Sequence, residues 1–528
     1  MIAPPTRRPL RKVDDFFELD CFQLIVLLFN EFLIYTMLSN MVFNIFGISK
    51  AELRGCDDEI FNGTIAERCN YFLNTNCTKP IVHYEFQSTV AEFELYCPAR
   101  QETYLGSIMA SMGVVNRAKF STTIQMIGII IGSAAAGQLS DLYGRKKITL
   151  SFLILIFVTS FVSTFSIDMD FYIIMRFLIG LAGGGLNTVS GIYIVEMLPA
   201  NHRIWLSTVI TWAPNYLLFA LIAKLTGTWR GLSFVNSMIT LAAVFICAFL
   251  LPESPKFLVQ KRREQDFLKA LLYVNRFKRT RNQYAEEEIE AFVFANKLRT
   301  HEEKQKKYSF RHLYSNNQLA IRTMVCSISM FSLSFVTYGL IFNLDVIKGS
   351  IYLNTAFSGM LRWIVGATIA LSDHFGHKYV GRRRLHYTTM SVIATCMALT
   401  FAIYATGREK ELATLIQCLT LFAFGTTGSL FLQILIVASE LFPTGVRNLA
   451  VANINVCGRI GNVFGPMVFS LPPVISGLPY MIMSALCFLD VGLFAFFIPE
   501  TKGVPLPNDM PAGRKKKEDV AMVELLKK

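Results

Sequence analysis

Twelve runs of apolar residues, each long enough to cross a lipid bilayer as a helix, constrain this 528-residue chain more than any other feature. A helix needs about 20 residues to span the hydrocarbon core. With 53% hydrophobic residues, the chain carries more apolar surface than one or two soluble cores bury, which predicts an all-α, multi-pass membrane protein. Windowed hydropathy places the spans at 22–47, 120–140, 148–167, 171–197, 205–225, 231–251, 321–344, 351–371, 387–405, 412–438, 448–471 and 480–499.

The net charge of +13 follows the positive-inside rule and does not indicate a nucleic-acid partner. Basic residues gather on one side of the spans, in "TRRPLRK", "GRKK", "HKYVGRRRLH", "FPTGVRN" and "GRKKKED", whereas the opposite turn "SIDMD" has none. Both termini are therefore predicted to be cytosolic. The first apolar run is too long for the core of a signal peptide and is expected to remain as a membrane helix.

The long polar segment 48–118, after the first span, is predicted to be extracellular or lumenal. It holds the two Asn-x-Ser/Thr sequons of the chain, at Asn62 and Asn76, which are candidate glycosylation sites. It also contains four cysteines, in a location where disulfides persist: Cys56, Cys69, Cys77 and Cys97. Four cysteines permit three pairings, and the sequence does not choose among them.

Three signatures occur in the same order in each half of the chain, which indicates an internal duplication. "SDLYGRKK" matches "SDHFGHK", "VEMLPANHR" matches "SELFPTGVR", and "LPES" matches "IPET". In this alignment Gly144 pairs with Gly376, and Glu253 pairs with Glu500. Two such six-helix halves form a pseudo-symmetric transporter with its substrate site near the midplane.

The duplication and the charged segments divide the chain into five regions. Between the halves, spacing at i, i+3 and i+4 predicts short amphipathic helices in a solvated linker. The regions are a cytosolic N-terminus 1–21, a first half 22–252, a cytosolic central loop 253–320, a second half 321–500 and a cytosolic tail 501–528.

The motifs "GQLSDLYGRKK", "RFLIGLAGGG", "PESPKFL", "ELFPTGVRN" and "PETKG", with a long cysteine-bearing first loop, resemble the organic cation, anion and carnitine transporters of the major facilitator superfamily. The resemblance covers nearly the whole chain and implies twelve helices that transport by alternating access. This family's first loop usually holds six cysteines, so its disulfide pattern does not carry over to the four found here.

The resemblance also implies that charged motifs between the helices act as gates. The gating positions on this chain are Asp141, Gly144, Arg145, Glu196, Arg203, Asp373, Glu440 and Arg447. Arg145 is expected to bridge to Glu196 or Glu440. The alternative is a basic loop that only sets topology.

Four strong charges lie deep in the predicted spans, where ionisable residues mark functional sites by default. They are Glu31, Arg362, Arg459 and Asp490. At about 1.5 Å per residue, each lies ~14–18 Å from the nearest landmark at its helix end. A fifth charge, Arg176, is expected to reach the lipid–water interface at the outer boundary.

Arg459, in "NINVCGRIGNVFGPMVF", is the residue on which the prediction of substrate charge depends. In the family that the chain resembles, this position tends to be arginine in anion carriers and aspartate in cation carriers. A guanidinium offers bidentate hydrogen bonds to a carboxylate and repels an ammonium. Arg362 falls where the family usually has an acid, although the lysine of some anion carriers is replaced by Gly366. The alternative for Arg459 is a purely structural pair with Asp490.

Aromatic and amide side chains around these charges are candidates for the lining of a substrate site. They are Asn40, Tyr216, Phe331, Tyr338 and Phe431. Each could equally be a packing residue.

Together these features predict a transporter of small organic anions at the plasma membrane, with an intracellular membrane as the alternative. A co-transported or counter-transported ion would drive it, because the chain has no phosphate-binding "GxxxxGK[ST]" loop. A cation or zwitterion carrier, and a non-transporting receptor or scaffold, remain as alternatives. We expect no enzyme activity, cofactor, metal or nucleic acid, and the oligomeric state stays open.

Overall fold

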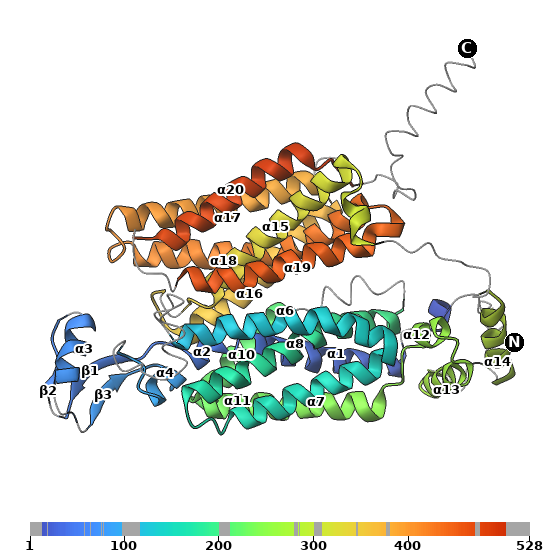
Figure 1. The fold of residues 1–528 in the computed structure, drawn as a ribbon, viewed down its shortest axis with the longest axis horizontal. Helices are drawn as coiled ribbons and strands as arrows, with labels where there is room; N and C mark the ends of the chain where they lie inside the picture. The colour runs from blue at the N-terminus through green and yellow to red at the C-terminus, as the bar shows by residue number, and fades with distance from the viewer. Residues whose placement is uncertain are drawn as a thin grey trace, which may run out of the picture. The chain divides into compact units, whose positions relative to one another are not determined.

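The computed structural model divides the chain into two compact units (Figure 1). The first unit comprises residues 13–97 and 120–299, and the second comprises 309–502 with 117–119. The residues that the structure describes are 13–17, 20–57, 59–63, 65–74, 77, 79–97, 117–199, 212–278, 284, 286–299, 309–344, 347–375, 381–469 and 476–502.

Helices lie across all twelve predicted spans. In the first unit they are α1 (Cys21–Met41), α6 (Arg117–Tyr143), α7 (Arg145–Ser163), α8 (Met169–Met197), α10 (Trp212–Thr226) and α11 (Trp229–Phe245), which continues as the π-helix η3 (Ile246–Leu250). In the second unit they are α15 (Asn317–Ile341), α16 (Ile351–Phe375), α17 (Arg382–Ala405), α18 (Ala413–Leu441), α19 (Thr444–Val468) and α20 (Leu478–Phe497).

Within the described residues, nine helices are long and apolar enough to cross a membrane. The remaining three are α10, of which 15 residues are described, and the helices α16 and α19 that carry Arg362 and Arg459. The predicted span 22–47 corresponds to the apolar segment Cys21–Gly47, in which α1 ends at Met41 and a short separate helix, α2 (Asn44–Gly47), follows.

Capping side chains fix where several of these helices begin. The Asp168 carboxylate accepts a hydrogen bond from the Phe171 N–H (2.8 Å) at the start of α8, and the Thr228 hydroxyl accepts one from the Gly231 N–H (3.1 Å) at the start of α11. Such caps satisfy backbone donors that have no partner inside the helix. Polar turns thereby separate apolar helices that would otherwise run together.

The core of the first unit lies between α1, α7, α8 and α11. Phe29 and Leu33 of α1 are buried against Leu153 and Ile156 of α7. The same helices also expose large apolar side chains, including Val158 at 46%. A helix that is apolar on all sides suits a membrane interior better than water.

In the second unit, α19 packs along α15 through its glycines. A Cβ atom at Gly461 would lie 2.5 Å from the Phe331 carbonyl oxygen, and one at Gly465 would lie 2.4 Å from the Phe335 carbonyl oxygen. Only glycine permits backbones to approach this closely. The glycines of "CGRIGNVFGP" therefore hold the helix of Arg459 against the helix of Tyr338.

A small antiparallel sheet lies in the loop after α1, so the prediction of an all-α protein is wrong there. Its strands are β1 (Glu52–Cys56), β2 (Glu59–Ile60) and β3 (Pro80–His83), in the order β2-β1-β3. Disulfides join Cys56 to Cys77 and Cys69 to Cys97, around a small apolar cluster. Asn62 is exposed beside the sheet, whereas Asn76 lies outside the described residues.

The carboxylate of Glu92 helps to anchor the loop to the first unit, beside a backbone bridge between Gln87 and Thr228. Glu92, at the end of α4 (Thr89–Glu92), accepts hydrogen bonds from Arg230 Nη2 (2.6 Å) and Trp229 Nε1 (2.6 Å). Arg230 also donates to the carbonyls of Thr164 and Ser166, at the end of α7. One arginine thus joins the loop, α7 and α11.

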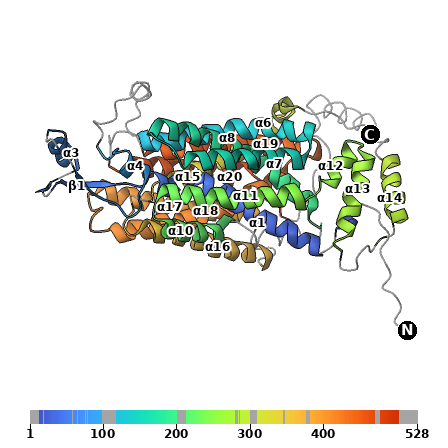
Figure 2. The same ribbon diagram turned by 90° about the horizontal axis from the view of Figure 1, so that it is seen from below.

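The segment between the halves is helical, as predicted, but it is not a solvated linker. It forms α12 (Pro255–Gln260), α13 (Glu264–Asn275) and α14 (Glu286–Arg299), with a 3-10 turn η4 (Phe310–Tyr314) before α15. Phe267, Leu271 and Ile289 are buried in the core of the first unit. These helices and the sheet lie at opposite ends of the first unit (Figures 1 and 2).

Candidate functional site

A cluster of charges joins the start of α7 to the ends of α8 and η3, and we call it the first charge cluster. Arg145 Nη1 pairs with Asp141 (2.6 Å), and Arg145 Nε lies 3.8 Å from the Glu196 carboxylate. The Ser254 hydroxyl donates to Glu196. Glu253 Oε1 accepts from the backbone N–H groups of Lys146 (2.8 Å) and Ser254 (3.0 Å).

The second unit repeats this arrangement in a second charge cluster. Arg382, at the start of α17, pairs with Glu440 of α18 (Nε to Oε1, 2.9 Å). The Thr501 hydroxyl donates to Glu440 (2.7 Å), and Glu500 Oε1 accepts from the Arg382 N–H (2.8 Å). Each cluster therefore ties three segments together through an arginine and two glutamates.

The equivalence corrects one detail of the sequence alignment, in which Gly144 pairs with Gly376. A Cβ atom at Gly144 would lie 2.4 Å from a Glu253 carboxylate oxygen, and one at Gly381 would lie 2.0 Å from that of Glu500. Gly381 thus makes the contacts that Gly144 makes, and residues 376–380 lie outside the described part of the chain. Sequence reasoning missed Arg382 as a member of the second cluster. Aligning "GRKK" at Gly144 with "GRRR" at Gly381 would have identified it as the equivalent of Arg145.

The remaining predicted gating residues are Arg203, Asp373 and Arg447. Arg203 lies outside the described residues, and so does the side chain of Asp373. Arg447 is half-buried and its Nε donates to the Phe442 carbonyl (3.3 Å), so it supports the turn between α18 and α19.

Arg459 and Tyr338 lie together on the neighbouring helices α19 and α15. Arg459 is half-buried and within electrostatic range of the Tyr338 hydroxyl. Tyr338 and Phe331 are half-buried positions, two helical turns apart, in an otherwise buried stretch of α15. Arg459 and Tyr338 are therefore neighbours across the helix pair, and Phe331 shares the half-buried face of α15 with Tyr338.

Arg362 lies beside Phe431, on the helix pair α16 and α18. Its guanidinium carbon is 5.2 Å from the ring centroid of Phe424 and 5.8 Å from that of Phe431. Cation–π contacts of this kind hold an arginine without neutralising it. No described carboxylate forms an ion pair with Arg362 or with Arg459.

Asp490 does not pair with Arg459, so the structural alternative drawn from depth alone is wrong. The Asp490 carboxylate is fully buried and lies 3.2 Å from His386 Nε2 on α17. The same ring nitrogen is 3.0 Å from the Ser329 hydroxyl, and the ring stacks on Phe494. His386, which sequence reasoning missed, is thus the polar partner of this carboxylate inside the unit.

In the first unit the predicted residues are engaged with neutral partners. Glu31 accepts a hydrogen bond from the Asn215 amide (2.9 Å). Asn40 is buried, donates to the Thr36 carbonyl (2.9 Å) and accepts from Ser160 (3.2 Å). Tyr216 is buried beside Asn215 on α10.

Arg176 does not reach the lipid–water interface, contrary to the prediction. It is fully buried, with its guanidinium carbon 4.2 Å from the Phe43 ring centroid and 5.0 Å from that of Tyr172. Its Nη2 donates to the Ser163 hydroxyl (3.2 Å). The guanidinium of Arg176 is therefore covered by aromatic rings and not by the lipid headgroups that the prediction implied.

One group of potential metal ligands occurs within the described residues, and its chemistry does not suit an ion. Cys56, Asp57 and Cys77 lie close together, but the two sulfurs are joined in a disulfide. Metal binding requires thiolates.

Three comparisons with known proteins agree with this architecture. The profile of the family described as "Sugar (and other) transporter" matches residues 81–508. Solute carrier family 22 member 6 of Pseudopleuronectes americanus is 30% identical over 405 residues, covering 75% of this chain and 70% of that protein. Organic cation transporter 1 of Caenorhabditis elegans is 25% identical over 416 residues, covering 77% and 68%.

The inward-open xylose transporter XylE from E. coli has a similar fold, with a TM-score of 0.60 at 16% identity, covering 92% of this chain and 97% of that one. The fold and the duplicated clusters define a multi-pass membrane transporter of the major facilitator superfamily, not an enzyme. The chain belongs to the sugar (and other) transporter family and is related to solute carrier family 22.

Glu440→Gln tests the second charge cluster. The ion pair with Arg382 is four-fifths buried, and hydrogen bonds to charged groups are worth ~1.5–3 kcal/mol. We expect uptake of a labelled organic ion to fall at least about tenfold at matched surface level. The control Glu411→Gln removes the exposed pair with Arg408 and should leave uptake unchanged. Equal uptake in both variants would argue against a role for the cluster.

His386→Leu tests the buried pair. The substitution leaves Asp490 without its partner, and breaking a buried pair costs ~3–5 kcal/mol. The purified variant should therefore unfold at a lower temperature than the wild type when followed by intrinsic fluorescence. The double variant His386→Leu with Asp490→Leu should recover most of the loss. A single variant that unfolds like the wild type would show that the pair contributes nothing.

Proposed function

We propose that this protein carries small organic anions across the plasma membrane by alternating access, driven by the gradient of an exchanged or co-transported ion. In this proposal both termini and the two charge clusters face the cytosol, and the disulfide-bonded loop faces outward. All twelve long helices cross the membrane. The positive-inside distribution of lysine and arginine supports this orientation.

One observation carries the preference for anions. Within the second unit, the buried carboxylate of Asp490 has His386 as its partner, whereas Arg459 and Arg362 have no described carboxylate partner. An uncompensated guanidinium in a low-dielectric setting attracts carboxylates and sulfonates. The two arginines therefore have the electrostatic character of an anion site.

Each arginine comes with aromatic neighbours that suit an amphipathic ligand. Tyr338 lies near Arg459 and shares its helix face with Phe331, and Phe431 lies beside Arg362. Aromatic faces contribute apolar contact area, while the guanidinium fixes the charged end. We assign these five side chains to substrate binding in the second half, with Asn40 and Tyr216 as further candidates in the first.

A cation or zwitterion carrier is the second candidate, and Glu31 favours it. This half-buried carboxylate is held only by the neutral amide of Asn215 among the contacts described. A relative of the chain bears the name organic cation transporter. A non-transporting receptor with the same fold is a third candidate, which saturable uptake of any solute would exclude.

Uptake in cells expressing the protein tests this function. A labelled aromatic carboxylate and a labelled quaternary ammonium are compared in wild type, Arg459→Ala, Arg459→Asp and Arg459→Lys at matched surface levels. We expect saturable carboxylate uptake that both Ala and Asp abolish and Lys retains in part, because lysine keeps the charge but not the bidentate geometry. Saturable ammonium uptake by the wild type, without carboxylate uptake, would contradict the anion assignment.

A further inference from the structure

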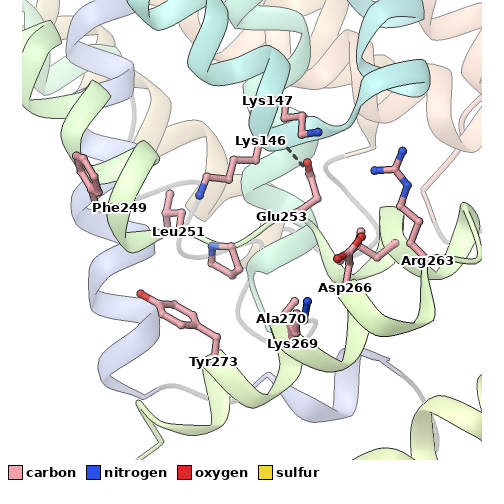
Figure 3. A pocket seen from close by; sticks show the side chains of 12 residues that line it. Lys146, Lys147, Phe249, Leu251, Glu253, Arg263, Asp266, Lys269, Ala270 and Tyr273 are labelled. Carbon is pink, nitrogen blue, oxygen red and sulfur yellow. Dashed lines mark hydrogen bonds between the residues drawn. The ribbon is translucent and has the colours of Figure 1, made fainter.

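A pocket of about 460 Å³ lies where α7 begins, η3 ends and α13 passes (Figure 3). Its walls come from both membrane-spanning and polar segments. Phe249 of η3 exposes 73% of its surface, and Phe245, one turn before it, exposes 55%. α13, by contrast, is not among the apolar membrane helices. The pocket therefore lies where a candidate membrane span ends beside a polar helix.

The charges around the pocket do not balance. Four basic side chains line it, Lys146, Lys147, Arg263 and Lys269, against the two acids Glu253 and Asp266. Glu253 is already bound to the backbone at the start of α7, as the dashed line in Figure 3 marks. Over the described part of the chain, Lys147, Arg263 and Lys269 form no ion pair, and all three are exposed.

Hydrogen bonds hold the pocket walls in place. The Tyr273 hydroxyl of α13 donates to the Leu250 carbonyl (3.2 Å), and Lys146 Nζ donates to the Ala248 carbonyl (3.0 Å). Burial raises the pKa of Tyr273, partly offset by Arg276, so its hydroxyl remains a donor at neutral pH. These hydrogen bonds do not involve Lys147, Arg263 or Lys269. The three basic side chains are therefore available to a ligand in the pocket.

We propose that this pocket binds the phosphate-bearing headgroup of an anionic phospholipid from the adjacent leaflet. Lys147, Arg263 and Lys269 supply the charge, and Phe249 packs against the glycerol and acyl region. Basic pockets at the cytosolic ends of membrane helices bind such headgroups. The exposed phenyl ring beside the basic side chains favours a lipid over free phosphate, because a soluble anion gains nothing from it.

Binding of a fluorescent short-chain phosphatidylinositol bisphosphate to the purified full-length protein tests this site, with phosphatidylcholine of the same chain length as reference. The pocket variant is Lys147→Gln, Arg263→Gln and Lys269→Gln combined. The matched control is Lys261→Gln, Arg262→Gln and Arg276→Gln, which removes the same charge from exposed positions of the same region outside the pocket lining.

We expect the pocket variant to bind the anionic lipid at least about tenfold more weakly than the wild type, and the control within about twofold. If both variants bound the anionic lipid equally weakly, binding would depend on the general positive charge of the surface and not on the pocket. That result would overturn the proposed site. Free inositol trisphosphate binding as tightly as the lipid would overturn the lipid assignment. If the triple variant does not fold, the single exposed substitution Lys269→Glu serves the same comparison. No measurable binding by the wild type would refute the proposal.

Discussion

An ionised side chain without a partner inside hydrocarbon costs several kcal/mol, and this cost organises the charges of both units. Asp490 is buried beside His386, and Arg176 is covered by Phe43 and Tyr172. Arg459 and Arg362 are different, because each is only half-buried and has aromatic neighbours without a described counter-charge. The contrast is one of burial: Asp490 and Arg176 are enclosed by the fold, whereas Arg459 and Arg362 are partly exposed.

The duplicated clusters at the helix ends answer a different requirement, the partners that the first backbone N–H groups of a helix lack. In each unit a glutamate accepts hydrogen bonds from the first backbone N–H groups of a helix, where the helix dipole favours negative charge, and a second glutamate pairs with the adjacent arginine. The outcome is that α7 with α8, and α17 with α18, are joined at their ends by ion pairs and hydrogen bonds as well as by packing. Such contacts suit a carrier that alternates between two states.

Much of the fold could be predicted from the sequence, because hydropathy reports directly on which segments lipid accepts. The helix ends could not, since α7 and α17 begin at Arg145 and Arg382, in basic stretches that an apolar window excludes. The sheet β2-β1-β3 was missed because its strands have two to five residues and depend on disulfides. The alternative that paired Arg459 with Asp490 failed for another reason: depth along a helix does not tell which way a side chain points.

Binding of an aromatic carboxylate and of its neutral carboxamide to the purified protein tests the central claim most directly. The two ligands share shape and aromatic surface, so they differ mainly in the charge that Arg459 would recognise. A charge-assisted hydrogen bond is worth ~1.5–3 kcal/mol, and the carboxylate should therefore bind at least about tenfold more tightly. Equal binding of the two, or tighter binding of the carboxamide, would contradict recognition of an anion by an uncompensated arginine.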